Sequence, residues 1–341
     1  MRVLFLTYPR IGLNRGGLQI QIEETAKGLT ELGVEVVFYD PWRNQIPEVD
    51  LCHAFSIDGA VLPHLERAAE SRKPVIVSPV FSAFAHGAYL TRVKVLLSSS
   101  IPGMYSDLRR AQRILNVASH VIALNADEES LIRCSFPSVS SRRITVIPNG
   151  IDVRFATGNP EIFRAKYKLG SFILTVGSIE PNKNQLALIQ AMKQLDSQLV
   201  IIGRANRSYS DYFALCQKEA STQKNILFAG EIPHGDPLLA SAFAASELFV
   251  LPSFSEVMPL SLYEAALAGC KVAASDSFPL QPEVARYVSR FTPSSASSIS
   301  MVLAKELQGR LNEGLKNAVL TMPSWTTISR RILDIYEGLC V

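Results

Sequence analysis

Two glutamates in the second half of the chain are the first candidates for chemistry. Glu256 and Glu264 lie eight residues apart, on either side of a predicted helix start. Pro259 suits the first position of that helix, so Glu256 would lie in the preceding loop and the amides near Leu260 would lack helical partners. Glu264 would lie in an otherwise apolar helix, where a carboxylate requires a partner. Hydroxyl groups of a sugar or ribose would satisfy both carboxylates; the alternatives are a structural hydrogen bond and solvent.

A lysine and two glycine turns add a second kind of chemistry. Residues 176–184 (VGSIEPNKN) follow a predicted strand and place Lys183 at the head of the next helix. A cation beside a helix N-terminus suits a diphosphate, and a solvated lysine is the alternative. Gly16 and Gly17 lie between the first strand and an amphipathic helix. They would let the backbone approach a ligand closely, or they form a plain strand-to-helix turn.

Short apolar runs alternate with segments of helical period, and they must form the elements that position these residues. Such runs indicate parallel strands buried on both faces, and each half of the chain holds enough of them for a doubly wound α/β sheet. At about 150 residues per domain, 341 residues correspond to two domains. We expect domains at 1–155 and 156–322, facing each other across a cleft, and a C-terminal helix at 323–341. The predicted strands are 3–7, 34–39, 49–55, 75–80, 121–125, 144–148, 172–176, 199–203, 226–230, 248–252 and 271–275.

Several enzyme classes and partners are excluded by what the sequence lacks. It has no Gly-x-Gly, no Gly-Lys pair and no Gly-x-Ser-x-Gly, which are the marks of dinucleotide, phosphate-loop and serine hydrolase sites. The five cysteines are scattered and the five histidines do not cluster, so we expect no disulfide framework and no metal. A net charge of +3 is too small for a dedicated nucleic-acid binder. No apolar run is long enough for a membrane helix, and a cytoplasmic location is expected.

Taken together and in order, these segments resemble glycosyltransferase family 4, whose members are retaining enzymes with the GT-B fold. The resemblance covers nearly the whole chain, and several correctly spaced matches make it more specific than any single motif. Residues 248–269 contain the Glu-x7-Glu motif of the family. The other matching segments are Gly16-Gly17, the end of the first domain at 147–152, the strand-turn-lysine segment at 176–184, and the C-terminal helix that follows Ser324 and contains Tyr336.

The resemblance implies a transferase that uses a nucleotide-sugar donor, retains the anomeric configuration and needs no metal or other cofactor. It assigns catalytic roles to Glu256, which would contact the donor sugar, and to Lys183, which would bind the diphosphate. Glu264 would bind the ribose of the donor. The base would be held by the backbone of residues 228–232. The remaining donor contacts would come from Gly16, Gly17, Ile232, Pro259 and Leu260.

Departures from the family pattern leave some roles open. Ser178 stands where the family often has an arginine, so one charge partner of the phosphates is missing or supplied elsewhere. Arg204, which follows the strand at 199–203, is the candidate substitute, and both residues are counted as donor-binding. The first domain also lacks the histidine that often ends its fourth strand. His86 or His53 could serve near the acceptor, with a structural role as the alternative.

The basic segment from Arg67 to Arg113 suggests a location for the acceptor. It contains eight Lys or Arg and two acidic residues, and Arg109, Arg110 and Arg113 fall within about one helical turn. Such a face would attract an anionic membrane or a phosphorylated lipid-linked acceptor; a solvated basic helix is the alternative.

Three functions remain open at this point. The favoured one is a retaining glycosyltransferase that moves a sugar to a glycan, lipid-linked or small-molecule acceptor. A non-catalytic GT-B subunit that binds a nucleotide or a partner is the second, motivated by Ser178. A sugar-nucleotide epimerase is the third, and the Glu-x7-Glu block argues against it.

Overall fold

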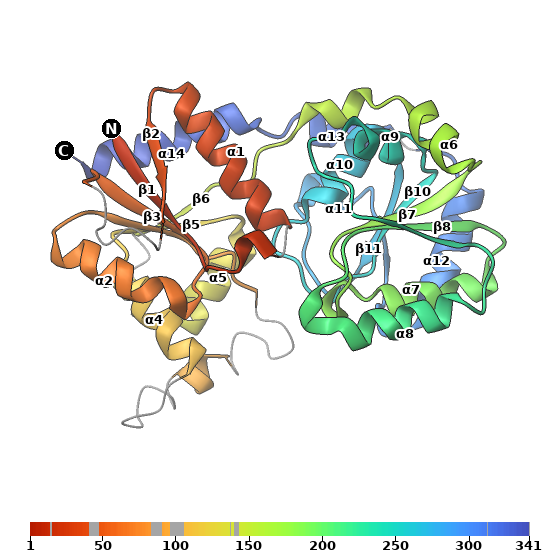
Figure 1. The fold of residues 1–341 in the computed structure, drawn as a ribbon, viewed down its shortest axis with the longest axis horizontal. Helices are drawn as coiled ribbons and strands as arrows, with labels where there is room; N and C mark the ends of the chain where they lie inside the picture. Colours follow the sequence, from red (N-terminus) through yellow and green to blue (C-terminus); the bar gives the residue numbers. More distant parts are fainter. Residues whose placement is uncertain are drawn as a thin grey trace. The chain divides into compact units, whose positions relative to one another are not determined.

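The computed structural model describes residues 1–13, 16–40, 48–82, 91–95, 106–136, 138–139, 143–311 and 313–340. The chain divides into two compact units (Figure 1): unit 1 comprises residues 1–150 and 325–341, and unit 2 comprises residues 151–324. Each unit is built on a six-stranded sheet in which the paired strands are parallel. The predicted α/β class with two doubly wound sheets is confirmed.

Unit 1 has the strand order β2-β1-β3-β4-β5-β6. Its strands are β1 (Arg2–Leu6), β2 (Glu35–Phe38), β3 (Leu51–Phe55), β4 (Val75–Ser78), β5 (His120–Ala123) and β6 (Ile144–Val146). Its helices are α1 (Gly17–Glu31), α2 (Leu62–Glu70), α4 (Asp107–Val117), α5 (Ala126–Ser135) and α14 (Trp325–Leu339), with the short helices η1 (Ile11–Leu13) and η2 (Gly59–Val61).

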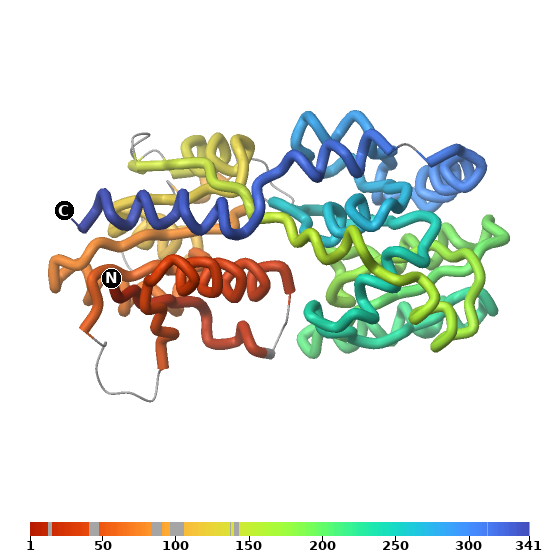
Figure 2. Tube along the Cα trace, turned by 90° about the horizontal axis from the view of Figure 1, so that it is seen from above, coloured from red at the N-terminus to blue at the C-terminus, as the bar shows by residue number. Residues whose placement is uncertain are grey.

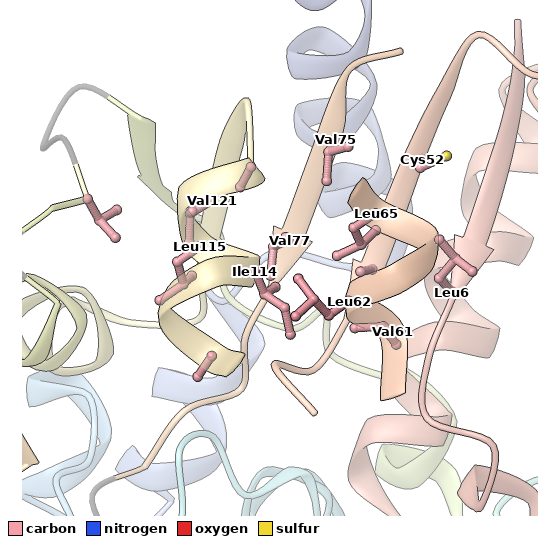
Figure 3. Packing of buried hydrophobic residues seen from close by; sticks show 14 of the residues in the cluster. Leu6, Cys52, Val61, Leu62, Leu65, Val75, Val77, Ile114, Leu115 and Val121 are labelled. Carbon is pink, nitrogen blue, oxygen red and sulfur yellow. The ribbon is translucent and has the colours of Figure 1, made fainter. Parts of the chain in front are cut away.

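Both faces of the unit 1 sheet are buried, because successive strand side chains point to opposite sides. In β1, Val3 and Phe5 join the cluster under α1 and α14. Leu4 and Leu6 join the cluster under α2 and α4, where Leu65 and Ile114 are fully buried (Figure 3). This explains why the strands are continuous apolar runs rather than alternating ones.

The C-terminal helix α14 completes unit 1. It runs beside α1 (Figure 2) and contributes Ile328, Ile332 and Tyr336 to the core. The hydroxyl of Tyr336 lies 2.6 Å from Nδ1 of His53, and Nε2 of His53 lies 2.8 Å from Oγ of Ser78. Burial lowers the pKa of His53 to about 3, so the ring is neutral. His53 is therefore a core histidine with both nitrogens in use, and the structure does not support it as an acceptor-side residue.

Unit 2 has the strand order β12-β11-β10-β7-β8-β9. Its strands are β7 (Phe172–Val176), β8 (Gln198–Ile202), β9 (Ile226–Gly230), β10 (Leu248–Leu251), β11 (Lys271–Ser275) and β12 (Ser289–Phe291). Its helices are α6 (Pro160–Tyr167), α7 (Gln185–Ala191), α8 (Ser210–Ala220), α9 (Pro237–Ala245), α10 (Leu260–Ala268), α11 (Pro282–Ala285), α12 (Ala296–Gln308) and α13 (Gly314–Leu320), with the short helices η4 (Val153–Thr157), η5 (Pro181–Lys183), η6 (Met192–Gln194) and η7 (Arg207–Tyr209).

The two faces of the unit 2 sheet differ in their packing. Aliphatic residues from α7 and α12, such as Leu188 and Leu303, cover one face. Aromatic rings pack on the other face, where the ring centroids of Phe163 in α6 and Phe172 in β7 lie 5.5 Å apart. Burial of both faces explains the continuous apolar strands of this half as well.

All eleven predicted strands are present, with ends that differ by up to two residues. The twelfth strand, β12, was not predicted because its three residues, Ser289–Phe291, contain no apolar run. None of the helices in the described ranges is both long and apolar enough to cross a membrane.

Glu128 is a buried carboxylate that joins the ends of two strands of unit 1. Its Oε1 accepts a hydrogen bond from the amide of Phe81, after β4, and its Oε2 accepts one from the amide of Leu124, after β5, both at 2.6 Å. Burial raises the pKa of Glu128 to about 7, although the two backbone hydrogen bonds oppose this rise. Ionisation of this side chain therefore costs the folded state free energy.

Replacing Glu128 with glutamine should remove a pH-dependent part of the stability. The pKa rises from 4.5 in the reference state to about 7 in the fold. The free energy of unfolding of the wild type should therefore fall, relative to that of Glu128→Gln, as the pH rises through this interval. Chemical denaturation across the interval measures the difference. Asp127→Asn, an exposed residue of the same helical turn, should show no such trend, and an equal trend in both variants contradicts the prediction.

Candidate functional site

The order of strands in unit 2 identifies where a ligand would bind. From β7, the chain builds the sheet to one side through β8 and β9, and then returns to the other side of β7 with β10, β11 and β12. Open parallel sheets bind ligands outside the carboxyl ends of the strands at such a reversal point. In unit 2 this point lies between the loops that follow β7 and β10. Those loops are the two segments that the sequence analysis singled out, at 176–184 and 252–259.

Lys183 and Glu256 meet at this reversal point. The Nζ atom of Lys183 lies 2.6 Å from Oε1 of Glu256, although the residues are 73 positions apart in the sequence. Backbone bonds hold the two loops together: the amide of Phe254 donates to the carbonyl of Asn182 at 2.8 Å. The side-chain amide of Asn182 donates to the carbonyl of Ser255 at 3.0 Å. The charged pair is thus fixed by its loops, with only 11% of the Glu256 side chain exposed.

Asn184 holds the start of α7 against two other loops. Its φ of +54° lies in the left-handed region, which asparagine tolerates better than most residues. Its side-chain amide donates to the carbonyls of Pro252, at 3.2 Å, and Pro293, at 2.8 Å. Lys183 directly precedes this anchored residue, so the backbone that carries the lysine is well fixed.

Two glycines let the ends of β7 and β8 approach each other. Gly177 and Gly203 both have positive φ, and a β-carbon on Gly203 would lie 1.8 Å from the carbonyl oxygen of Gly177. Beyond these glycines, the amide of Ile179 donates to the carbonyl of Arg204 at 2.9 Å. Arg204 therefore lies beside the turn that carries Ser178, as its suggested role as a substitute requires. Its guanidinium lies 3.8 Å from a carboxylate oxygen of Glu231.

Glu264 is paired with a histidine that the sequence analysis did not select. Its Oε1 lies 2.7 Å from Nε2 of His234, and only 9% of the Glu264 side chain is exposed. The partner that this carboxylate requires is thus protein, which the sequence left open. Burial lowers the pKa of His234, but the hydrogen bond and charge of Glu264 and the charge of Asp152 outweigh it, so the net shift is upward. The sequence signal that could have selected His234 is its position after β9, at the same edge of the sheet as the loops that follow β7 and β10.

The start of α10 offers backbone amides at this edge of the sheet. The helix begins at Leu260, one residue later than predicted, and Pro259 is its N-cap. Proline supplies no side-chain cap, so the amides of this end can bind an anion, with the positive end of the helix dipole behind them.

The remaining predicted site residues are Gly16, Gly17, Ile232, Arg109 and His86. Gly16 is the N-cap of α1 and Gly17 its first residue, and a β-carbon on either would meet no atom within 4 Å. Ile232 is half-buried in the loop after β9. Arg109 lies in the first turn of α4, and His86 is outside the described residues. Within the described ranges, no group of three or more His, Cys, Asp or Glu could hold a metal ion.

Two protein-family models match the chain. The model described as Glycosyltransferase Family 4 matches residues 15–155, and the model described as Glycosyl transferases group 1 matches residues 161–307. The match to Glycosyltransferase Family 4 lies in unit 1 except for residues 151–155, which belong to unit 2. The match to Glycosyl transferases group 1 lies within unit 2. The chain therefore belongs to the glycosyltransferases that these two models describe.

Relatives with assigned functions are also glycosyltransferases. The chain is 33% identical over 168 residues to UDP-Gal:alpha-D-GlcNAc-diphosphoundecaprenol alpha-1,3-galactosyltransferase of Escherichia coli, covering 45% of this chain and 41% of that protein. It is 27% identical over 318 residues to D-inositol 3-phosphate glycosyltransferase of Pseudarthrobacter chlorophenolicus, covering 76% and 74%. The match thus spans about two fifths of the length of the Escherichia coli relative and three quarters of the other.

Solved structures with the GT-B fold superpose on nearly the whole chain. Anabaena Alr3699/HepE in complex with UDP and glucose has a TM-score of 0.75 at 18% identity, covering 99% of this chain and 100% of that one. Sucrose-phosphate synthase from Thermosynechococcus elongatus has a TM-score of 0.75 at 20% identity, covering 99% and 98%. At these identities the likeness shows the fold, and the predicted GT-B fold is confirmed.

Substitution of Gly203 by alanine should destabilise unit 2 and disrupt the site. The new β-carbon would overlap the backbone oxygen of Gly177, so the two loops must separate, at a cost of about 2 kcal/mol or more. Chemical denaturation measures the loss. Gly170→Ala is the control, because a β-carbon there meets no atom within 4 Å. Equal stability of the two variants contradicts the close approach of the loops.

Proposed function

We propose that this chain transfers a sugar from a nucleotide-diphosphate donor to a glycan, lipid-linked or small-molecule acceptor, with retention of the anomeric configuration. The observation that carries the proposal is the Lys183–Glu256 pair at the reversal point of the unit 2 sheet. A cation and a carboxylate, fixed side by side, suit the two ends of a sugar diphosphate: the lysine suits the phosphates and the carboxylate suits the sugar hydroxyls.

Lys183 can bind the diphosphate without leaving Glu256. An ammonium group has three donors, and one of them is directed at Glu256 in this structure. The amides at the start of α10 add partial positive charge at the same sheet edge. Arg204 would supply the second cation, in place of an arginine at Ser178, after releasing Glu231. The site thus has protein cations for the phosphates, and we propose that no metal ion is required.

The chemical step follows from the same groups. The bond between the anomeric carbon and the diphosphate oxygen breaks, and the acceptor oxygen bonds to that carbon on the same face. The leaving diphosphate takes the proton of the acceptor hydroxyl. Lys183 and the α10 amides stabilise the negative charge that develops on the diphosphate, which is the part of the reaction that preorganised dipoles assist most. Glu256 orients the donor sugar through its hydroxyl groups.

The acceptor would bind through unit 1, and the basic segment 67–113 suggests an anionic surface. Arg92 and Lys94 are exposed in the helical segment 91–95. Arg113 pairs with Glu66, which partly neutralises the segment. The E. coli relative is named for a diphosphoundecaprenol acceptor, an anionic lipid. We therefore propose peripheral contact with an anionic membrane, at its cytoplasmic face, as the place where a lipid-linked acceptor is met.

Calorimetric titration with UDP, GDP and ADP tests the donor site. UDP is the first candidate because the E. coli relative is named for UDP-Gal and Anabaena Alr3699/HepE was solved with UDP. One nucleotide should bind the wild type, and Lys183→Ala should weaken it by roughly tenfold or more, which is about 1.4 kcal/mol. Lys193→Ala is the matched control, since Lys193 pairs with Glu219 in the same unit. If no nucleotide binds the wild type, the proposed function is wrong.

Flotation with liposomes tests the membrane contact. The wild type should float with anionic vesicles at low salt, and replacement of Arg92, Lys94 and Arg109 by glutamine should reduce the floated fraction several-fold, because each cation near an anionic surface contributes about 1 kcal/mol. The control replaces three exposed lysines of unit 2, Lys218, Lys224 and Lys305, by glutamine. No flotation of the wild type, or an equal loss in both triple variants, contradicts the assignment to this segment.

A further inference from the structure

We infer that His234 is a positioning residue of the nucleotide site, which holds the Glu264 carboxylate in the orientation that binds the ribose hydroxyls of the donor. The inference rests on the proposed function and goes beyond it, because neither the motif nor the strand order assigns a role to this histidine. It is drawn from the contacts of His234 with two separate segments of unit 2, α10 and the segment at η4.

The hydrogen bond to His234 fixes one oxygen of Glu264. His234 lies in the loop between β9 and α9, and Glu264 lies in the second turn of α10, 30 residues later. A carboxylate has two oxygens and about four acceptor positions. With Oε1 bound to Nε2 of His234, the plane of the carboxylate is restrained, and Oε2 remains to accept hydrogen bonds from a ligand. An acceptor held in this way is preorganised for neighbouring hydroxyl groups, as on ribose.

His234 is in turn held by the segment that enters unit 2. Its ring lies 5.4 Å from the ring of Phe155 in η4, at an angle of 48°. The side chain of His234 is only 18% exposed, so little freedom remains for the ring. The histidine therefore connects η4 to α10 through one aromatic contact and one hydrogen bond.

The charges around His234 favour its protonated form. Glu264 of α10 and Asp152, just before η4, are the acidic groups that act on it, and Arg154 opposes them. Arg154 is itself bonded to Asp152 by its backbone amide and its guanidinium. A positive ring next to Glu264 offsets the repulsion between that carboxylate and a bound diphosphate. If the ring is neutral, its Nε2–H can still donate to Glu264, so the positioning does not require the charge.

Discrimination between UDP and 2′,3′-dideoxy-UDP tests the inference. By calorimetry, the wild type should prefer UDP by about tenfold or more, because the dideoxy nucleotide leaves the Glu264 oxygen without its ligand donors. His234→Ala should lower this preference to about threefold or less, mainly by lowering the affinity for UDP. His234→Gln, which carries an N–H donor, should restore most of it. His64→Gln is the control, because His64 bonds to Tyr39 in unit 1 at 2.8 Å.

Thermal unfolding establishes that each variant is folded before its discrimination is compared. If His234→Ala is folded and keeps the wild-type preference for UDP, the inference is overturned and the proposed function stands. If the wild type binds neither nucleotide, the proposed function fails and the inference fails with it. If His234→Gln loses the preference as fully as His234→Ala does, a hydrogen bond from this position is not what orients Glu264.

The pKa of His234, measured by NMR, gives a readout that needs no ligand. Because the hydrogen bond and charge of Glu264 raise this pKa, it should fall in Glu264→Gln relative to the wild type. The pKa of His120 in unit 1, which burial lowers, should be the same in both proteins. An unchanged pKa of His234 shows that the pair does not form in solution, and it overturns the inference by itself.

Discussion

The close approach of Gly203 to Gly177 is the constraint on which the unit 2 site depends. No side chain fits between the two loops, because a β-carbon on Gly203 would lie 1.8 Å from the carbonyl oxygen of Gly177. Their contact brings the backbone of Arg204 beside the turn that carries Ser178. The same turn leads to η5 and so to Lys183. The positions of the polar side chains at this edge therefore depend on two residues that have no side chain.

The sequence predicted much of this arrangement because its signals are local. Apolar runs located eleven of the twelve strands in the described ranges, and the exception, β12, contains no apolar run. Lys183 and Glu256 were selected from two separate motifs. That they bond to each other depends on β10 pairing with β7 in the sheet, and strand order is set by packing across the whole unit. Local patterns could place each residue on a loop but could not bring the loops together.

His53 and His234 show why some roles could not be predicted from the sequence. The sequence left both an acceptor-side role and a structural role open for His53. Its partners are Tyr336, which lies 283 positions later, and Ser78, so its role is structural. His234 looked isolated, yet Glu264 and Phe155 reach it from different elements. No sequence pattern identifies the role of a lone histidine, because that role depends on the groups around the ring and on how much water is excluded from it. Such residues are recognised only once the tertiary contacts are known.

The division of unit 1 between residues 1–150 and 325–341 also affects the order in which the two units fold. Its core needs Ile328, Ile332 and Tyr336 of α14, which leave the ribosome after all of unit 2. Domains usually fold as units during synthesis. Unit 2, which is continuous from 151 to 324, can therefore finish folding first, while the sheet face of unit 1 that packs under α1 and α14 still lacks α14. Of the two units, the one whose strands are translated first is completed last.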